Sequence, residues 1–406
     1  MKRYIRLIYS FFVLIVIIGM VLSSCKKETS VGVPSIRYVR ITDPTKSDSL
    51  LAGAYLGNMI NIIGDNLGSV REIWFNDQKA YLNPTLVTNQ SILVTVPDSI
   101  PIVVTDKMKL VYSSTDTLSL DFKAIVPAPT VTSMTCEYVN DGDVASIKGD
   151  FFINNSNTPL QVIFPGNIPG TIQSFSKKSI SVVVPTGSGP GPITVKSLYG
   201  STLSKFYFRD NRNIFLDFDS KVITGSWQNG VYASTNPAGI SGNYDRLAGG
   251  TRDAGGQPWD EVDFSFHFWP SPMGLPNTPL YSGDLSKAAL KFECNVYQTW
   301  SSGALEIMFV PYSVFYNNSY IAGDKNTPRA LWMPWKNSGS YITNGWTTVT
   351  IPLTDFIYVY DGTVCMTKLT QDMLYGCTFY LWNGGVSGKA CSPGLAVDNL
   401  RIVPIQ

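Results

Sequence analysis

Short runs of alternating apolar and polar residues recur along the chain from about residue 35 onward. In residues 91–97, Ile92, Val94 and Val96 share one face and Pro97 ends the run. In residues 289–297, apolar side chains again occupy every second position. A period of two is typical of half-buried β-strands, and Gly, Asn, Asp and Pro bound these runs as turn residues. The pattern predicts an all-β protein.

One strand-and-turn pattern occurs twice before residue 210. Residues 59–68 read M-I-N-I-I-G-D-N-L-G, and residues 144–152 read V-A-S-I-K-G-D-F-F. The first copy resembles the IPT/TIG immunoglobulin-like domain, in which the G-x-N-x-G segment (Gly64, Asn66 and Gly68) is a structural turn. The resemblance implies two tandem immunoglobulin-like sandwiches, at residues 35–126 and 127–209. The second copy lacks the closing glycine, which leaves its turn geometry open.

The N-terminus has the features of an export signal. Lys2, Arg3 and Arg6 precede an apolar run over residues 7–22, and Leu22-Ser23-Ser24-Cys25 follows. This tetrad resembles a bacterial lipobox, which implies a signal peptide at residues 1–25, lipidation of Cys25 and a tether at residues 26–34. An uncleaved membrane anchor is the alternative. Lys26-Lys27-Glu28 partly resembles the signal that sends lipoproteins to the cell surface.

The composition excludes several kinds of partner and site. Charged residues make up 15% of the chain and the net charge is +1, without a basic block. Nucleic acid is therefore not expected as a partner. The chain has one histidine and no C-x-x-C spacing, so no metal site is assigned. Five cysteines remain after processing, namely Cys136, Cys294, Cys365, Cys377 and Cys391. We expect buried free thiols, and a disulfide bond between Cys377 and Cys391 is the alternative.

The remaining residues, 210–406, form the expected C-terminal domain. Its opening and closing segments, residues 213–220 and 395–403, resemble the neighbouring first and last strands of jelly-roll carbohydrate-binding modules. The resemblance implies a jelly-roll-like β-sandwich carbohydrate-binding domain. Asp217 or Asp219 with Asp398 could hold a structural calcium ion, or the carboxylates could be solvated. No cofactor is required for this interpretation.

Tryptophan is concentrated in this last domain. Eight of the nine tryptophans lie between Trp227 and Trp382, most of them flanked by Pro, Gly, Asn or Ser. Such flanks place side chains in surface loops, where exposed indoles suit the faces of sugar rings. The alternative is that the loops fold their tryptophans onto the edge of the sandwich. The predicted carbohydrate-binding residues are Trp332, Trp335, Trp269, Trp300, Trp382 and Tyr316.

Catalysis has little support in the sequence. Glu293 and Glu306 lie on predicted strands and could flank a glycosidic bond, but the motif of jelly-roll glucanases is missing. His267 lies in an aromatic strand pattern, with no G-x-S-x-G element to supply a nucleophile. No catalytic residue is assigned.

Taken together, the lipobox, the IPT/TIG repeats and the tryptophan-rich domain resemble the surface glycan-binding proteins of Sus-like polysaccharide-utilisation systems. The resemblance implies a non-catalytic outer-membrane lipoprotein, exposed at the cell surface. It would capture a neutral polysaccharide (xyloglucan, mixed-linkage glucan or mannan) for a TonB-dependent transporter and its lipoprotein partner. The alternatives are an adhesin that binds a host or cell-surface protein and, with less support, a glycoside hydrolase.

Overall fold

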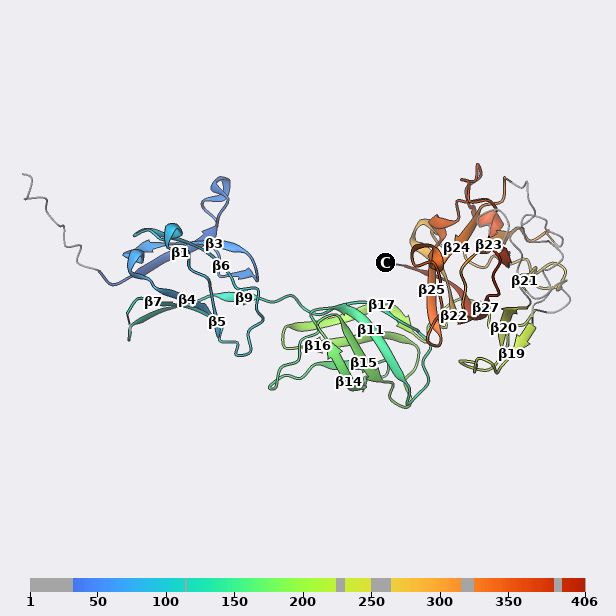
Figure 1. Cartoon of the computed structure of the whole chain (residues 1–406), viewed down its shortest axis with the longest axis horizontal. Coiled ribbons are helices and arrows are strands. Elements are labelled where there is room, and N and C mark those ends of the chain that lie inside the picture. The colour runs from blue at the N-terminus through green and yellow to red at the C-terminus, as the bar shows by residue number, and fades with distance from the viewer. Residues whose placement is uncertain are drawn as a thin grey trace, which may run out of the picture. The chain divides into compact units, whose positions relative to one another are not determined.

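The computed structural model describes residues 32–113, 115–223, 231–249, 264–314, 325–382 and 389–405 (Figure 1). These residues form β-strands and short 3-10 helices, without an α-helix among them, which confirms the predicted all-β class. Within the same ranges, no helix has the length and hydropathy needed to cross a membrane. The chain divides into two compact units, Met1–Pro127 and Ala128–Gln406.

The first unit contains an immunoglobulin-like sandwich. Its sheets have the strand orders β1-β3-β6 and β5-β4-β7-β8, and β2 pairs with β9 in parallel. Ile92 and Val94 of β6 are buried in its core, as their alternation predicts. The elements are β1 Ser35–Ile41, η1 Pro44–Lys46, β2 Gly53–Tyr55, β3 Met59–Asp65, η2 Leu67–Ser69, β4 Glu72–Phe75, β5 Gln78–Lys79, η3 Pro84–Leu86, β6 Ser91–Thr95, β7 Lys107–Val111, β8 Thr117–Asp121 and β9 Lys123–Ile125.

The second unit begins with another immunoglobulin-like sandwich, called here the second Ig domain. Its two sheets have the strand orders β10-β11-β15-β14 and β13-β12-β16-β17 around a core of its own. The elements are β10 Thr130–Met134, β11 Val144–Asp150, β12 Gln161–Phe164, β13 Ile168–Pro169, β14 Thr171–Ser176, β15 Ser179–Val183, β16 Gly191–Ser197 and β17 Gly200–Phe208.

The turn that identifies the repeat is the same in both sandwiches. A Cβ at Gly64 would lie 1.9 Å from the carbonyl oxygen of Ser35, and one at Gly149 would lie 1.9 Å from that of Thr130. Two residues later, Asn66 and Phe151 have φ values of 55° and 57°. Phe151 therefore takes the left-handed conformation that asparagine tolerates more easily.

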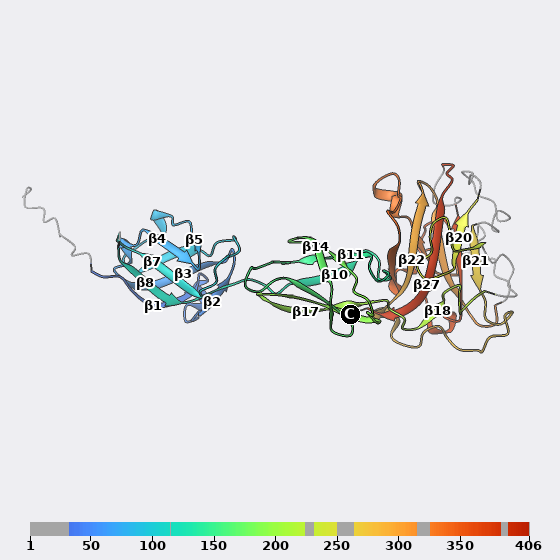
Figure 2. The same cartoon turned by 90° about the horizontal axis from the view of Figure 1, so that it is seen from below.

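A larger sandwich, the C-terminal domain, completes the second unit. A six-stranded sheet, β19-β20-β27-β22-β25 with β18 on β27, packs against a four-stranded sheet, β21-β26-β23-β24 (Figure 2). The pairing of β18 with β27 agrees with the expected neighbouring first and last strands. The elements are β18 Ile214–Leu216, β19 Val231–Ala233, β20 Tyr244–Ala248, β21 Ser265–Phe268, η5 Leu285–Lys287, β22 Ala288–Gln298, β23 Ala304–Val310, β24 Arg329–Trp332, η6 Pro334–Asn337, β25 Thr347–Pro352, η7 Leu353–Asp355, η8 Gln371–Met373, β26 Gly376–Trp382 and β27 Gly394–Pro404.

Buried charges join the second Ig domain to the C-terminal domain. Glu137 accepts hydrogen bonds from Lys291 Nζ at 2.5 Å and from Arg401 Nη2 at 2.8 Å. Arg401 also pairs with Glu293, and neither of these two side chains is exposed. Next to them, the Glu137 amide donates to Thr348 Oγ1 at 2.7 Å. Since Glu137 and Lys291 are paired only when both domains are in place, the joint is a fixed part of the unit.

Candidate functional site

The four-stranded sheet of the C-terminal domain has two unlike faces. Strict alternation sends one set of side chains into the sandwich core: Phe266, Phe268, Leu305, Ile307, Phe309, Phe379 and Leu381. The opposite face is aromatic and polar. This outer face carries Ser265, His267, Glu306, Met308, Arg329, Thr378, Tyr380 and Trp382.

The strand register places these side chains in two rows across the sheet. Tyr380 lies between Ser265 on one neighbouring strand and Glu306 on the other. Thr378 lies between His267 and Met308 in the same way. Directly opposed residues in antiparallel strands have Cβ atoms about 5 Å apart, so each row is a continuous surface.

One end of the outer face is held by hydrogen bonds to Thr378. His267 Nδ1 lies 3.0 Å from Thr378 Oγ1, and Trp269 Nε1 donates to the same oxygen at 3.2 Å. The His267 and Trp269 rings are 4.4 Å apart between centroids. Burial lowers the pKa of His267 to about 3, so the imidazole is neutral at physiological pH.

The middle of the outer face holds an ion pair in a fully buried setting. Arg329 Nη1 donates to Glu306 Oε2 at 2.5 Å, and neither side chain is exposed. Burial raises the pKa of Glu306 to about 7 despite the guanidinium. An aliphatic layer would stabilise a sandwich at least as well as a buried ion pair, so stability alone does not account for these residues.

Two polar groups on this face lack a hydrogen-bond partner in the described part of the chain. They are Glu306 Oε1 and the Trp382 indole N–H. Trp382 stacks obliquely on Tyr380 at 5.4 Å between centroids, and Tyr380 is opposite Glu306. A buried acceptor and a buried donor without partners cost free energy, and they mark a place where a ligand's hydroxyl groups could bind.

The predicted sugar platforms are less exposed than expected. Trp269, Trp300 and Trp382 are 2%, 0% and 5% exposed, so the expectation that these three are solvent-facing is wrong. Trp382 does share the face of Tyr380, as the alternation predicts. Trp300 is a core residue, because its indole donates to Ser302 O at 2.7 Å and packs on Trp332 at 5.5 Å.

Trp332 and Trp335 are half-buried at the edge of the core. Trp332 ends β24 beside a cavity of about 370 Å³ that Thr350, Asp355 and Tyr358 also line. Trp335 lies in η6, and its indole donates to Gly303 O at 2.8 Å. These two keep accessible surface that a sugar could contact. Tyr316 and Cys25 lie outside the described residues.

Glu293 and Glu306 are not placed as the two carboxylates of a glycosidase. Glu293 on β22 points away from the core toward the second Ig domain. It accepts hydrogen bonds there from Arg401 of the neighbouring strand β27. Glu306 points away from the core on the opposite sheet. Two carboxylates on opposite outer faces of one sandwich cannot flank a single glycosidic bond, which needs them about 5 to 10 Å apart.

The remaining predicted sites are simpler to place. None of the five cysteines is in a disulfide and all are buried, as expected, so Cys377 and Cys391 are not bridged.

Asp217 Oδ1 accepts from the amides of Asp219, Ser220 and Lys221, and Asp219 accepts from Asn243. The described residues contain no group of three or more His, Cys, Asp or Glu side chains arranged for a metal. Calcium at Asp217 or Asp219 with Asp398 stays a prediction.

Comparison with known proteins agrees with this architecture. A family model described as the surface glycan-binding protein B xyloglucan binding domain matches residues 208–404. The crystal structure of the surface glycan-binding protein PbSGBP-B from Prevotella bryantii is 30% identical. That match has a TM-score of 0.79 and covers 92% of this chain and 99% of that chain.

Two further relatives are more distant. An IPT/TIG domain-containing protein from Bacteroides ovatus is 24% identical over 289 residues, which is 66% of this chain; the chain spans only 56% of that relative's length. An SGBP-B from a complex xyloglucan utilization locus in Bacteroides uniformis is 15% identical, with a TM-score of 0.46, and covers 92% of this chain and 100% of that chain. PbSGBP-B matches nearly the whole of this chain, and the family model matches the chain's C-terminal domain. The chain therefore belongs to the SGBP-B surface glycan-binding proteins of Sus-like systems, a non-catalytic family.

Proposed function

We propose that this chain binds a neutral plant cell-wall β-glucan, xyloglucan in the first place, through its C-terminal domain. The match of residues 208–404 to a xyloglucan binding domain supports this ligand class. The low content of charged residues, 15%, favours an uncharged polysaccharide over a polyuronate or a sulfated glycan. Mixed-linkage glucan and β-mannan are the other ligands to test.

The observation that carries the proposal is the outer face of the four-stranded sheet. Its aromatic rings supply surfaces for the apolar faces of sugars, and its polar groups supply hydrogen bonds to hydroxyls. Glu306 Oε1 and the Trp382 N–H would gain the partners that the described residues do not give them. Because the face is buried, glycan binding has to uncover it. Trp332 and Trp335 would contact the sugar chain at the edge.

The proposal extends to the place where capture occurs. The lipobox-like segment that ends at Cys25 supports acylation, and two or three acyl chains anchor a protein firmly, since each buried methylene contributes about 0.8 kcal/mol. In this proposal the protein is attached to the outer membrane and exposed at the cell surface. It passes the polysaccharide to a TonB-dependent transporter and that transporter's lipoprotein partner.

Affinity electrophoresis of the full chain in gels that contain xyloglucan, mixed-linkage glucan or β-mannan tests the proposal. We expect retardation by xyloglucan, weakened in Trp382→Ala and less so in Trp382→Phe, which keeps an aromatic ring. Trp74→Ala, which removes a half-buried indole from the first sandwich, is the matched control and should bind like the unaltered chain. Migration unaffected by any of the three polysaccharides would contradict glycan binding and favour the adhesin alternative.

A further inference from the structure

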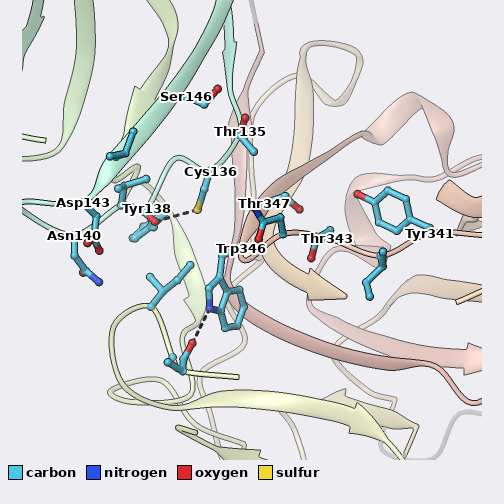
Figure 3. A pocket seen from close by; sticks show the side chains of 17 residues that line it. Thr135, Cys136, Tyr138, Asn140, Asp143, Ser146, Tyr341, Thr343, Trp346 and Thr347 are labelled. Carbon is cyan, nitrogen blue, oxygen red and sulfur yellow. Dashed lines mark hydrogen bonds between the residues drawn. The ribbon is translucent and has the colours of Figure 1, made fainter. Parts of the chain in front are cut away.

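A cavity of about 740 Å³ lies where the second Ig domain meets the C-terminal domain (Figure 3). One wall is formed by residues 135–146 of the second Ig domain. The other is formed by two segments of the C-terminal domain, residues 238–240 and 341–347. This joint cleft borders β25 in the six-stranded sheet, and the outer face described above belongs to the other sheet.

Hydrogen bonds between the domains fix the walls of the joint cleft. The amide of Thr348 donates to Thr135 O at 2.9 Å, and the amide of Glu137 donates to Thr348 Oγ1 at 2.7 Å. The Tyr138 hydroxyl donates to Asp210 O at 2.7 Å. With the Glu137–Arg401 pair behind them, these contacts preorganise the cleft, so a ligand need not spend binding free energy on assembling it.

Trp346 is a fixed and partly accessible platform in this cleft. Its indole N–H donates to Ala238 O at 2.8 Å, and its ring meets Tyr244 edge to face at 5.3 Å between centroids. The side chain is nevertheless half-buried rather than buried. Figure 3 shows Tyr138 and Asn140 on one side of it and Tyr341 on the other. Such a ring offers a surface without loss of rotamer freedom on binding.

The polar groups around Trp346 are hydroxyls and amides. The lining includes no lysine or arginine, and Asp143 is its one carboxylate. The uncharged hydrogen-bonding side chains that line the cleft include Thr135, Asn140, Ser146, Thr343, Asn344 and Thr347. An aromatic surface among uncharged donors and acceptors suits a ligand rich in hydroxyls and without charge.

We propose that the joint cleft is a second glycan-binding subsite, in which Trp346 stacks against a sugar ring of a neutral oligosaccharide. The ligand class is the one in the proposed function, but the site is separate from the outer face and draws one wall from the second Ig domain. One polysaccharide chain that occupies both sites would then bind with higher avidity, without tighter individual sites.

Isothermal titration calorimetry of the full chain with a xylogluco-oligosaccharide tests the subsite. We expect about two equivalents bound by the unaltered chain. Val144→Arg, at a lining residue that is 48% exposed, should reduce this to about one by filling the cleft. Leu203→Arg, at a 58% exposed strand residue of the same domain that does not line the cleft, should leave two. Trp346→Ala should weaken the second site about fivefold, from roughly 40 Å² of lost apolar contact.

The outcomes separate this inference from the proposed function. A single equivalent that Val144→Arg leaves intact would overturn the subsite and keep the outer face. A single equivalent that Val144→Arg abolishes would support the cleft and overturn the outer face as the site. If the oligosaccharide does not bind at all, both are overturned. Near-ultraviolet circular dichroism identifies any variant that has failed to fold.

Discussion

Arg401, three residues before the end of the last strand, donates to Glu137 in the loop after the first strand of the second Ig domain, at 2.8 Å. The two residues are 264 positions apart in the chain. Glu137 also accepts from Lys291, so one carboxylate holds two cations of the C-terminal domain.

Removing the charge of Glu137 should weaken this joint. In Glu137→Gln, Lys291 loses its ionic partner and Arg401 loses one of two, and breaking a buried pair in this way costs about 3 kcal/mol. Urea unfolding followed by circular dichroism measures the change. Glu72→Gln, which disrupts an exposed pair with Lys79, should leave the unfolding midpoint nearly unaltered. Equal effects of the two substitutions would show that Glu137 does not stabilise the joint.

The buried and the edge tryptophans should respond differently to substitution. Trp300→Ala should lower the free energy of unfolding by about 3 to 5 kcal/mol, because it empties a fully buried site. Trp335→Ala should cost less stability, since this indole is half-buried, and should weaken glycan binding about fivefold, since the proposed function places it against the sugar chain. Thermal unfolding and affinity electrophoresis on both variants separate these effects. A stable Trp300→Ala protein with reduced glycan affinity would show that Trp300 is a contact after all.

Stability should depend on pH through Asp398. Burial raises the pKa of this carboxyl to about 8, and its Oδ2 has no hydrogen-bond partner among the described residues. Between pH 4 and pH 8 the folded protein keeps a proton that the unfolded chain has released. The contribution of the protonated Asp398 carboxyl to the free energy of unfolding is therefore complete below the pKa of this group in the unfolded chain. As the pH rises toward 8, this contribution is lost, at up to about 1.4 kcal/mol per pH unit.

Chemical denaturation of Asp398→Asn at several pH values tests this dependence. The substitution keeps the shape of the side chain and removes the titration, so the fall in stability between pH 4 and pH 8 should become flatter. An unchanged slope in the variant would mean that another group titrates in that range.

The repeated turn should tolerate no side chain at its glycine. Gly149→Ala should destabilise the protein by about 2 kcal/mol or more, because the new Cβ would overlap the Thr130 carbonyl. Gly64→Ala should act in the same way through Ser35. Gly189→Ala, where nothing lies within 4 Å of the added Cβ, is the control and should stay within about 0.5 kcal/mol. Thermal unfolding compares the three, and a neutral Gly149→Ala would contradict the close approach.

The thiols should be unreactive until the protein unfolds. Burial raises the pKa of Cys136, Cys294 and Cys377, so little thiolate forms at neutral pH. In a Cys25→Ser chain, Ellman's reagent should label no thiol quickly in the native protein and five thiols in guanidinium chloride. Rapid labelling in the native state would show that at least one of the thiols is accessible.

Much of the fold follows from local pattern, because a period of two fixes which side chains share a face. It places Tyr380 and Trp382 together, and it sends Glu293 and Glu306 out of the core. Burial of the tryptophans was not predictable in this way. The turn residues around Trp269 and Trp300 indicate the conformation of the backbone. Whether an indole is covered depends instead on residues distant in sequence, such as Thr378, which accepts a hydrogen bond from Trp269.

The joint between the domains was also beyond sequence reasoning. Glu137, Lys291 and Arg401 lie far apart in the chain, and nothing local marks them as partners. The second turn shows the opposite case. Its sequence lacks the expected asparagine and glycine, yet Phe151 takes the φ that Asn66 has in the first copy, because Gly149 and its tight packing are retained.

Because β18 pairs with β27, the chain enters and leaves the C-terminal domain through adjacent strands. A recognition domain with both ends side by side can be exchanged as a cassette without rebuilding the domain that carries it. A C-terminal domain grafted from a relative with another glycan preference would need to keep Arg401 and Lys291, because both form ion pairs with the Glu137 carboxylate. Ligand preference can therefore change by recombination between genes as well as by substitution within one.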